Sequence, residues 1–197
     1  MRFTYFITAF LATLAIASPI SSDTDIAEGV NLVTRDTVTQ TPEYKAAAAA
    51  HSGLQKDKYY YFLLKWELPA KIADGDTETL SELQQLQKNL GFEHIGVVVG
   101  QVTETTKGKT GKKQTTQDFK AFLYHMTKDK DNNVMGHSPT YKYDGKPLEY
   151  GGTTSKKAVD KAKTNAKDYV ADKDHKAYNV DNNNCNTYAQ AVLQAFK

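Results

Sequence analysis

Residues 94–102 read HIGVVVGQV, an apolar and β-branched stretch that is typical of a buried β-strand. The stretches KYYYFLLKWEL at 58–68 and DFKAFLYHMT at 118–127 have the same character and predict two further strands. The segment 103–117 between the last two is polar and basic, with glycines near its middle, so we expect a solvated loop there. These three strands form the centre of the predicted fold.

Helices are expected around these strands. Leucines at helical spacing predict a helix that ends at Leu90. Ser155 can cap a long helix with a narrow apolar stripe and a lysine-rich outer face, and Cys185 starts a closing helix. Residues 128–150 contain turn-forming residues with at most short strands around Pro139–Tyr143, and 177–180 predicts a short strand. This order predicts an α+β domain with an antiparallel sheet packed against helices.

The N-terminus has the three parts of a secretory signal peptide. Arg2 precedes an uncharged apolar run, and an Ala-Ile-Ala sequence ends that run at residue 17. The run is too short for a membrane span, which needs about 20 apolar residues, and no later segment is expected to span a membrane. We therefore expect cleavage near Ala17 and a secreted, extracellular protein.

The domain organisation follows from this pattern. Residues 1–17 form the predicted signal peptide. Residues 18–42 are polar with few large apolar side chains, and the helix formers at 43–53, ended by Gly53, predict a short helix. We expect residues 18–55 to form a leader, a linker or a propeptide. The compact domain is expected over residues 56–197.

The composition argues against several classes of partner and cofactor. The chain of 197 residues carries 25 basic and 23 acidic side chains, whereas a nucleic-acid-binding protein normally has a concentrated basic excess. It has no glycine-rich phosphate loop, and its single cysteine and scattered histidines lack the spacing of zinc ligands. We therefore expect no nucleic acid, cofactor or metal, and the sequence leaves the oligomeric state open.

The single cysteine, Cys185, is a candidate nucleophile. It follows the run Asp-Asn-Asn-Asn and precedes an apolar helix, so it is expected at a helix N-terminus, where partial positive charge favours a thiolate. The backbone amides there could also help to hold an oxyanion. The alternative is structural, because Cys185 shares one helical face with Tyr188 and Val192 and could be a small buried hydrophobe.

A thiol nucleophile needs a base, and the base needs an orienting partner. His94 begins one predicted strand and His125 lies near the end of the next. If the two strands form a hairpin centred on Lys109 and Thr110, the two histidines are directly opposed on one face. The other three histidines lie in the leader or in polar stretches that we expect to be exposed.

The segments GFEHIGVVVG, FLYHMT and YNVDNNNCNTYAQAV together resemble the circularly permuted papain-like group of the NlpC/P60 superfamily, within it the lecithin:retinol acyltransferase-like and PPPDE-type families. The resemblance covers roughly residues 56–197. It implies a papain-like α+β fold in which Cys185 is the nucleophile, His94 the base and His125 the orienting residue. Asn184 is a weaker candidate for substrate or oxyanion support.

The resemblance implies a secreted cysteine hydrolase or acyltransferase that acts on an amide, peptide, ester or thioester bond. Its partner would be a peptide, amide or acyl substrate. One alternative is a secreted, non-catalytic effector or binding protein that keeps the same fold. Another is a protein that binds anions or carbohydrates through its lysine-rich segment, with lysines at 107, 109, 112 and 113.

Overall fold

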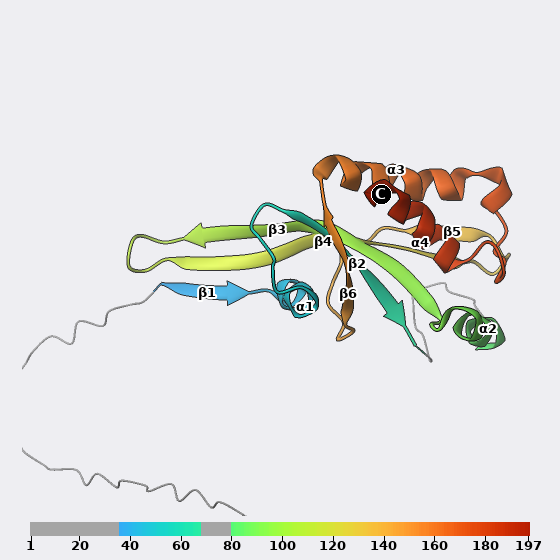
Figure 1. Cartoon of the computed structure of the whole chain (residues 1–197), viewed down its shortest axis with the longest axis horizontal. Coiled ribbons are helices and arrows are strands. Elements are labelled where there is room, and N and C mark those ends of the chain that lie inside the picture. The colour runs from blue at the N-terminus through green and yellow to red at the C-terminus, as the bar shows by residue number, and fades with distance from the viewer. Residues whose placement is uncertain (1–35, 68–79) are drawn as a thin grey trace, which may run out of the picture. The chain divides into compact units, whose positions relative to one another are not determined.

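The computed structural model describes residues 36–67 and 80–197 (Figure 1). The expected signal peptide and most of the expected leader lie outside the described residues. The described helices are α1 (Pro42–Ala50), α2 (Leu80–Leu90), α3 (Lys156–Ala171) and α4 (Cys185–Leu193), with single 3₁₀ turns at Lys173–His175 and Gln194–Phe196.

A six-stranded sheet forms the centre of the fold, in the order β1-β4-β3-β2-β6, with β5 pairing the far end of β4. Its pairs are antiparallel except for β1, which runs parallel to β4, so the sheet is mixed rather than antiparallel throughout. The strands are β1 (Thr37–Gln40), β2 (Tyr59–Trp66), β3 (His94–Lys107), β4 (Gln114–Lys128), β5 (Val134–His137) and β6 (Leu148–Thr154).

Strands β3 and β4 form a long hairpin that extends beyond β2 and β6, and β1 lies alongside its outer part (Figure 1). The expectation of a loop over 103–117 is wrong for most of that segment, because only residues 108–113 lie between the two strands. The segment is rich in threonine, whose β-branched side chain suits a strand even where both faces meet water. Gly108 and Gly111 have φ angles of 98° and 81°, which a turn of this kind requires from glycine.

The hairpin register differs from the expected one. Lys107 pairs with Gln114, whereas a hairpin centred on Lys109 and Thr110 would pair Lys107 with Lys112. His94 and His125 are therefore not directly opposed. The shift amounts to two residues, and because side chains alternate with a period of two, both histidines stay on the same face.

The compact fold begins upstream of Lys56, where we expected it to start. Strand β1 pairs with β4, and α1 packs its Tyr44 and Ala47 into the core, with 8% and 0% of their surface exposed. Thr41 caps α1 by accepting a hydrogen bond from the backbone N–H of Tyr44, and Pro42 suits the first turn. Residues 37–50 are thus part of the domain rather than a leader to it.

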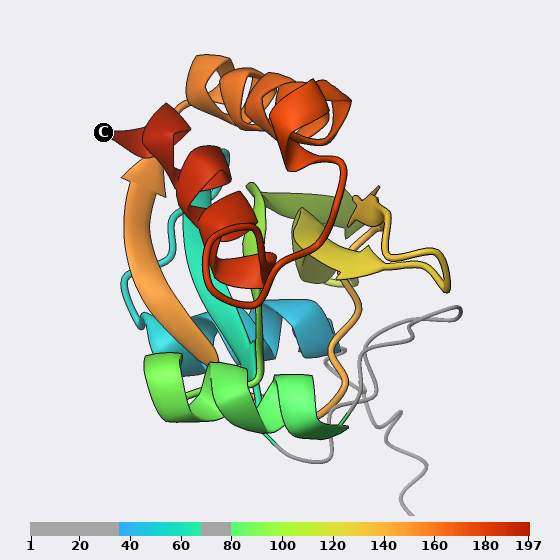
Figure 2. The same cartoon turned by 90° about the vertical axis from the view of Figure 1, so that its right-hand side faces the viewer.

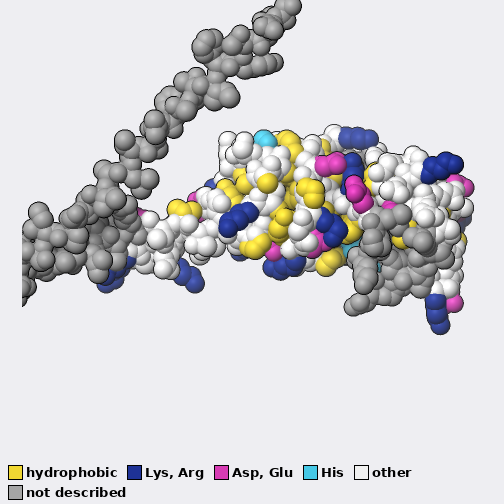
Figure 3. Space-filling model, turned by 90° about the horizontal axis from the view of Figure 1, so that it is seen from below, with side chains coloured by type: hydrophobic (Ala, Val, Ile, Leu, Met, Phe, Trp, Pro, Cys, Tyr) yellow, Lys and Arg dark blue, Asp and Glu magenta, His cyan; other side chains and the backbone are white. Residues whose placement is uncertain are grey.

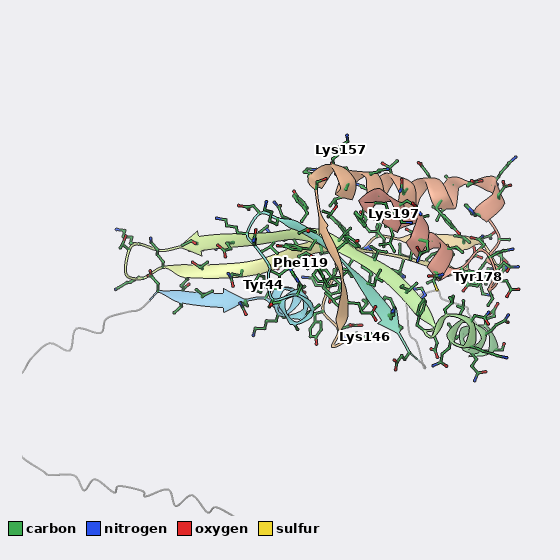
Figure 4. The ribbon with its side chains drawn as sticks, in the orientation of Figure 1. Tyr44, Phe119, Lys146, Lys157, Tyr178 and Lys197 are labelled. Carbon is green, nitrogen blue, oxygen red and sulfur yellow. The ribbon has the colours of Figure 1, made fainter. Side chains whose placement is uncertain are left out.

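The sheet separates two hydrophobic clusters, because its central strands alternate their side chains between two covered faces. Helices α3 and α4 lie on one face and α1 on the other, while α2 lies at the end where β3 begins (Figures 1 and 2). Val97 and Val99 join the α4 side, with Tyr188 and Val192. The α1 side contains Phe62 and Val98 of the sheet, and also Phe119 of β4 and Tyr44 of α1, both labelled in Figure 4.

In the C-terminal half, the positions of the short strands differ from those we expected. Residues 128–150 contain β5 and the start of β6, and β6 pairs with β2 as the other edge of the main sheet. The expected strand at 177–180 is absent as a strand. Ala177 makes one isolated bridge with Asn133, and Asn179 makes another with Asn183.

Candidate active site

Helix α4 begins at Cys185, as the sequence predicts. The side chain of Asn184 accepts hydrogen bonds from the backbone N–H groups of Asn186 and Thr187, and the Thr187 hydroxyl is 2.9 Å from the backbone N–H of Asn184. This reciprocal arrangement is a capping box, which satisfies N–H groups that the helix cannot pair internally. The Asn184 amide also donates to the Val180 carbonyl at 2.6 Å, so both ends of this side chain are engaged in holding the helix start.

A second network fixes the chain just before the cysteine. The Tyr169 hydroxyl of α3 donates to the side-chain carbonyl of Asn183 at 2.7 Å and lies 2.7 Å from the Thr187 hydroxyl. Asn183 in turn donates to the carbonyl oxygens of His175 and Ala177. Asn183 and Asn184 are therefore buried connectors, which explains why so polar a segment precedes an apolar helix, while Asn182 is exposed.

Cys185 itself is fully buried. Its thiol lies 3.9 Å from the backbone carbonyl oxygen of Glu93, the residue that precedes His94. Helix α4 thus presents the thiol to the peptide unit that joins Glu93 to His94, at the point where β3 begins.

The structure brings His94 and His125 together. Nε2 of His94 lies 3.3 Å from Nδ1 of His125, and both side chains are buried, with 0% and 3% of their surface exposed. The Trp66 ring packs edge-on against His94 with 4.9 Å between ring centroids. These three rings form one aromatic cluster at the end of the sheet.

Burial lowers the pKa of both imidazoles. The pKa of His94 is well below its ordinary value, because desolvation penalises the charged form and His125 and His137 add like-charge repulsion. Burial, and then the charge of His137, lower the pKa of His125 to about 4. Both rings are therefore neutral near pH 7, and a neutral imidazole can accept a proton.

A third histidine, His137, lies next to His125, although we expected it in an exposed stretch. We call His94, His125 and His137 the histidine row. His137 pairs directly with His125 across β4 and β5, and their rings stack with centroids 4.7 Å apart. Its Nε2 lies 2.8 Å from the Thr127 hydroxyl. This pairing could be predicted from the sequence only if β5 itself were predicted. The four residues of β5 do not alternate between apolar and polar side chains, so the sequence gives no such signal.

The thiol and the imidazole approach the start of β3 from different sides. His94 is paired with Trp66 and lies on the α1 side of the sheet, whereas Cys185 packs in the cluster on the α4 side. Nδ1 of His94 is buried and has no hydrogen-bond partner among the described residues. The thiol is therefore adjacent to the His94 backbone but is not hydrogen-bonded to its free ring nitrogen.

Within residues 36–67 and 80–197, no three histidine, cysteine or carboxylate side chains are arranged to hold a metal ion. In the same part of the chain, none of the helices combines the length and the apolar character that crossing a membrane requires. Comparison with protein-family models, curated proteins and solved structures finds no match to this chain.

Proposed function

We propose that the protein is a secreted thiol hydrolase or acyltransferase with a permuted papain-like fold. The observation that carries the proposal is the orientation of His94. Its Nε2 is occupied by His125 and its Nδ1 has no hydrogen-bond partner among the described residues, beside a helix that begins with the only cysteine of the chain. A base held at one nitrogen and free at the other is what a neighbouring nucleophile needs.

The orienting bond sets the protonation state that the chemistry requires. When Nε2–H of His94 donates to Nδ1 of His125, the lone pair of the His94 Nδ1 is left as a proton acceptor. His125 then carries its own proton on Nε2. In this arrangement His125 is a positioning residue, because it fixes the tautomer and the ring of His94 and does not contact the reacting atoms.

The reaction would proceed through an acyl-enzyme. The Cys185 thiol gives its proton to Nδ1 of His94 as its sulfur bonds to the substrate carbonyl carbon. The resulting imidazolium returns the proton to the leaving nitrogen, oxygen or sulfur as the acyl bond breaks, which leaves a thioester. Water or another acceptor then gives a proton to His94, attacks the thioester and releases the thiol.

Burial affects how the first step occurs. Because the pKa of His94 is lowered, a standing thiolate–imidazolium pair is disfavoured in the closed site. We therefore expect proton transfer to accompany attack rather than to precede it. The step also requires the thiol and Nδ1 to come within hydrogen-bonding distance. Because the two groups lie on different sides of the start of β3, the first residue of β3 must turn so that the His94 ring faces α4 when substrate enters.

The test is to trap the acyl-enzyme. The purified full chain is mixed with acetyl and butyryl nitrophenyl esters, an acyl thioester and an acylated peptide amide, and the adducts are followed by intact-protein mass spectrometry with peptide mapping. The expected result is one acyl group on Cys185. Cys185→Ala should abolish it, and His94→Ala should lower its rate of formation by about 100-fold or more.

Two controls separate this function from incidental reactivity. His51→Ala removes a partly exposed histidine that follows α1, outside the histidine row and outside the network before Cys185, and should leave the acylation rate unchanged. His125→Ala should slow acylation and change its pH profile, whereas a merely structural role would change only stability. Acylation that persists in Cys185→Ala, or that is indifferent to His94, would refute the proposal.

One observation favours a second candidate, a secreted binding protein that keeps this fold without catalysis. Both Cys185 and His94 have no exposed surface, and the thiol lies 3.9 Å from the backbone carbonyl oxygen of Glu93. In this case the thiol reacts with iodoacetamide only after the protein unfolds. Native alkylation that is complete well before any unfolding would decide for the enzyme.

A further inference from the structure

A small cavity of about 60 Å³ lies between strand β5 and helix α3. Figures 1 and 2 both show β5 beneath the second half of α3. Tyr124 of β4 and Tyr188 of α4 line the cavity, together with Lys163 and Lys167 of α3. A cavity needs roughly 10–15 Å³ to hold one water molecule, so this one accommodates about four to six atoms of that size. It has the size of one small ion and is too small for a sugar ring.

The cavity is open because residue 136 has no side chain. A Cβ atom at Gly136 would lie 2.9 Å from a methyl carbon of Val170 and 3.6 Å from the hydroxyl oxygen of Tyr188. Gly136 therefore faces the α4 side of the sheet, and any side chain at this position would occupy the space beside that hydroxyl. His137 also lines the cavity, but its ring stacks on His125 on the other face of the sheet.

Two phenol hydroxyls face the cavity. Tyr124 and Tyr188 are 3% and 1% exposed, and no hydrogen bond joins either hydroxyl to another group in residues 36–67 and 80–197. Neither oxygen is enclosed by protein, in contrast to the Tyr141 hydroxyl in the core on the α1 side, so each keeps its opening to the cavity. Burial raises the pKa of both hydroxyls, with Asp160 adding to the shift at Tyr124 and Tyr124 to the shift at Tyr188. Both hydroxyls therefore stay protonated and can donate.

The edge of β5 supplies a backbone donor at the same cavity. Val134 donates its backbone N–H to the Lys176 carbonyl at 2.8 Å, away from β4. Every second residue of an antiparallel strand directs its N–H and C=O groups to the same edge, so Gly136 directs its N–H to this edge as well. Residues 176 and 177 cover the edge at 133 and 134, and the cavity lies where it continues past them, at Gly136.

Two lysines give the cavity a positive charge. Lys163 and Lys167 are exposed and one helical turn apart on α3, and neither makes an ion pair with another described residue. Like charges at this spacing repel each other, and an anion between them relieves the repulsion. The nearest carboxylate of α3, Asp160, is paired with Lys156 at 2.9 Å. On the face that Figure 3 shows, lysines lie among acidic side chains, whereas the described lining of this cavity contains no carboxylate.

From these observations we infer that the cavity between β5 and α3 binds one phosphate group. Its donors belong to three parts of the lining: the phenols of β4 and α4, the backbone edge of β5 and the ammonium groups of α3. The four oxygen atoms of a tetrahedral phosphate can meet donors from several directions, whereas a carboxylate offers two oxygens in one plane. A phosphate group carries a charge of about −1.5 to −2 at pH 7, which two lysines match.

The phosphate group has two sources, inorganic phosphate and the phosphomonoester end of a small molecule. Lys163 and Lys167 are exposed, so the cavity meets solvent at α3 and the rest of a monoester would extend there. Cys185 does not line the cavity. The inference is therefore independent of the thiol chemistry, and Cys185→Ala should bind phosphate as the unaltered protein does.

The test uses inorganic phosphate, methyl phosphate and acetate as probes with the full chain, near neutral pH and at an ionic strength held constant with sodium chloride. Binding is measured from amide chemical shifts in two-dimensional NMR spectra. Inorganic phosphate is expected to give saturable shifts centred on the amide of Gly136, and acetate should give none. Methyl phosphate that binds equally well identifies a monoester as the source, and methyl phosphate that binds more weakly identifies the free ion. Both results support the inference.

Lysine variants test the charge at the cavity. Lys163→Gln and Lys167→Gln each remove one ammonium group and should weaken phosphate binding by about tenfold or more. Lys161→Gln is the matched control, because it makes the same change at an exposed position of α3 that does not line the cavity. It should leave the affinity within about twofold, since solvent and salt screen a distant surface charge.

Tyr188→Phe and Gly136→Ala test the inner wall of the cavity. Tyr188→Phe removes a donor that makes no hydrogen bond to the described residues, so phosphate binding should weaken by about three- to tenfold. The unfolding temperature of the phosphate-free protein should stay the same or rise. Gly136→Ala places a methyl group beside the Tyr188 hydroxyl and should abolish binding. If Gly136→Ala does not fold, Tyr188→Phe still decides the matter.

Several outcomes would overturn the inference. The first is that inorganic phosphate produces no saturable shifts, and the second is that acetate binds as tightly as phosphate. Equal weakening in Lys161→Gln and Lys163→Gln would show that phosphate is attracted to the lysine-rich helix in general. Binding that is unchanged in both Tyr188→Phe and a folded Gly136→Ala would show that the cavity is not the site.

Discussion

Nε2 of His94 and Nδ1 of His125 lie 3.3 Å apart, although the register of β3 and β4 does not oppose the two residues. The regular ladder ends where Val97 pairs with Tyr124, and its continuation would place Gly96 opposite His125. A Cβ atom at Gly96 would lie 3.3 Å from Cβ of His125 and 2.6 Å from a methyl carbon of Leu123. The missing side chain therefore leaves the His125 ring room to lean diagonally toward His94.

The buried histidine row should make stability depend on pH. The pKa of His125 is about 4 in the folded protein and near 6.5 in the unfolded chain, and the pKa of His94 is lowered in the same direction. Between these values the unfolded state binds more protons than the folded state. The free energy of unfolding therefore has its full value above pH 6.5 and decreases as the pH drops toward 4. His125 alone contributes about 3 kcal/mol to this loss.

Urea unfolding at a series of pH values measures this slope. His125→Gln should flatten it, because the variant removes one titrating group, while His175→Gln should leave most of it in place. An unfolding free energy that stays constant from neutral to mildly acid pH would mean that the row is hydrated rather than buried.

The cap of α4 should contribute to stability through one side chain. Asn184→Ala removes two hydrogen bonds to the backbone N–H groups of Asn186 and Thr187 and the bond to the Val180 carbonyl. We expect a loss of about 1–2 kcal/mol in the free energy of unfolding, measured by thermal or chemical denaturation. Asn184→Ser should recover part of it, because a serine hydroxyl can accept at the same position.

Asn186→Ala is the matched control for the cap. Asn186 contributes its backbone N–H to the Asn184 side chain, and the alanine variant keeps that group. Its effect should therefore be small. Equal losses in Asn184→Ala and Asn186→Ala would show that asparagine content, rather than the cap, matters in this segment.

The sequence predicts the regular elements where one residue pattern dominates. The apolar stretches at 58–68 and 118–127 and the caps at Ser155 and Asn184 indicate β2, β4, α3 and α4, because burial and capping leave clear local signals. The pairing of His94 with His125 is also anticipated in outline, since a shift of two residues keeps them on one face.

Other features depend on tertiary contacts that leave little trace in the local sequence. The threonine-rich arms of the β3–β4 hairpin look like a loop because both faces are polar. His137 joins the histidine row only because the short strand β5 pairs with β4. Cys185 lies on the α4 side of the sheet because α4 packs there. The number of residues between Cys185 and the histidines does not indicate this side.

The upstream boundary of the domain gives a sharp test of the fold. A chain that starts at residue 36 keeps β1 and α1, whereas a chain that starts at residue 56 loses both. The shorter chain uncovers the α1 side of the sheet, where Phe62 and Val98 are fully buried and pack in the same cluster as Tyr44 and Ala47. Removing large apolar contacts from a core costs several kcal/mol, which is a large part of the stability of an ordinary domain.

We therefore expect the chain from residue 36 to unfold cooperatively at nearly the temperature of the full chain. The chain from residue 56 should be insoluble, or should bind a hydrophobic dye and lack a cooperative transition. Tyr44→Ala in the full chain is a milder version of the same change and should lower the unfolding temperature without abolishing folding. Equal stability of the two truncated chains would contradict this prediction. It would show that the hydrophobic cluster on the α1 side is stable without α1.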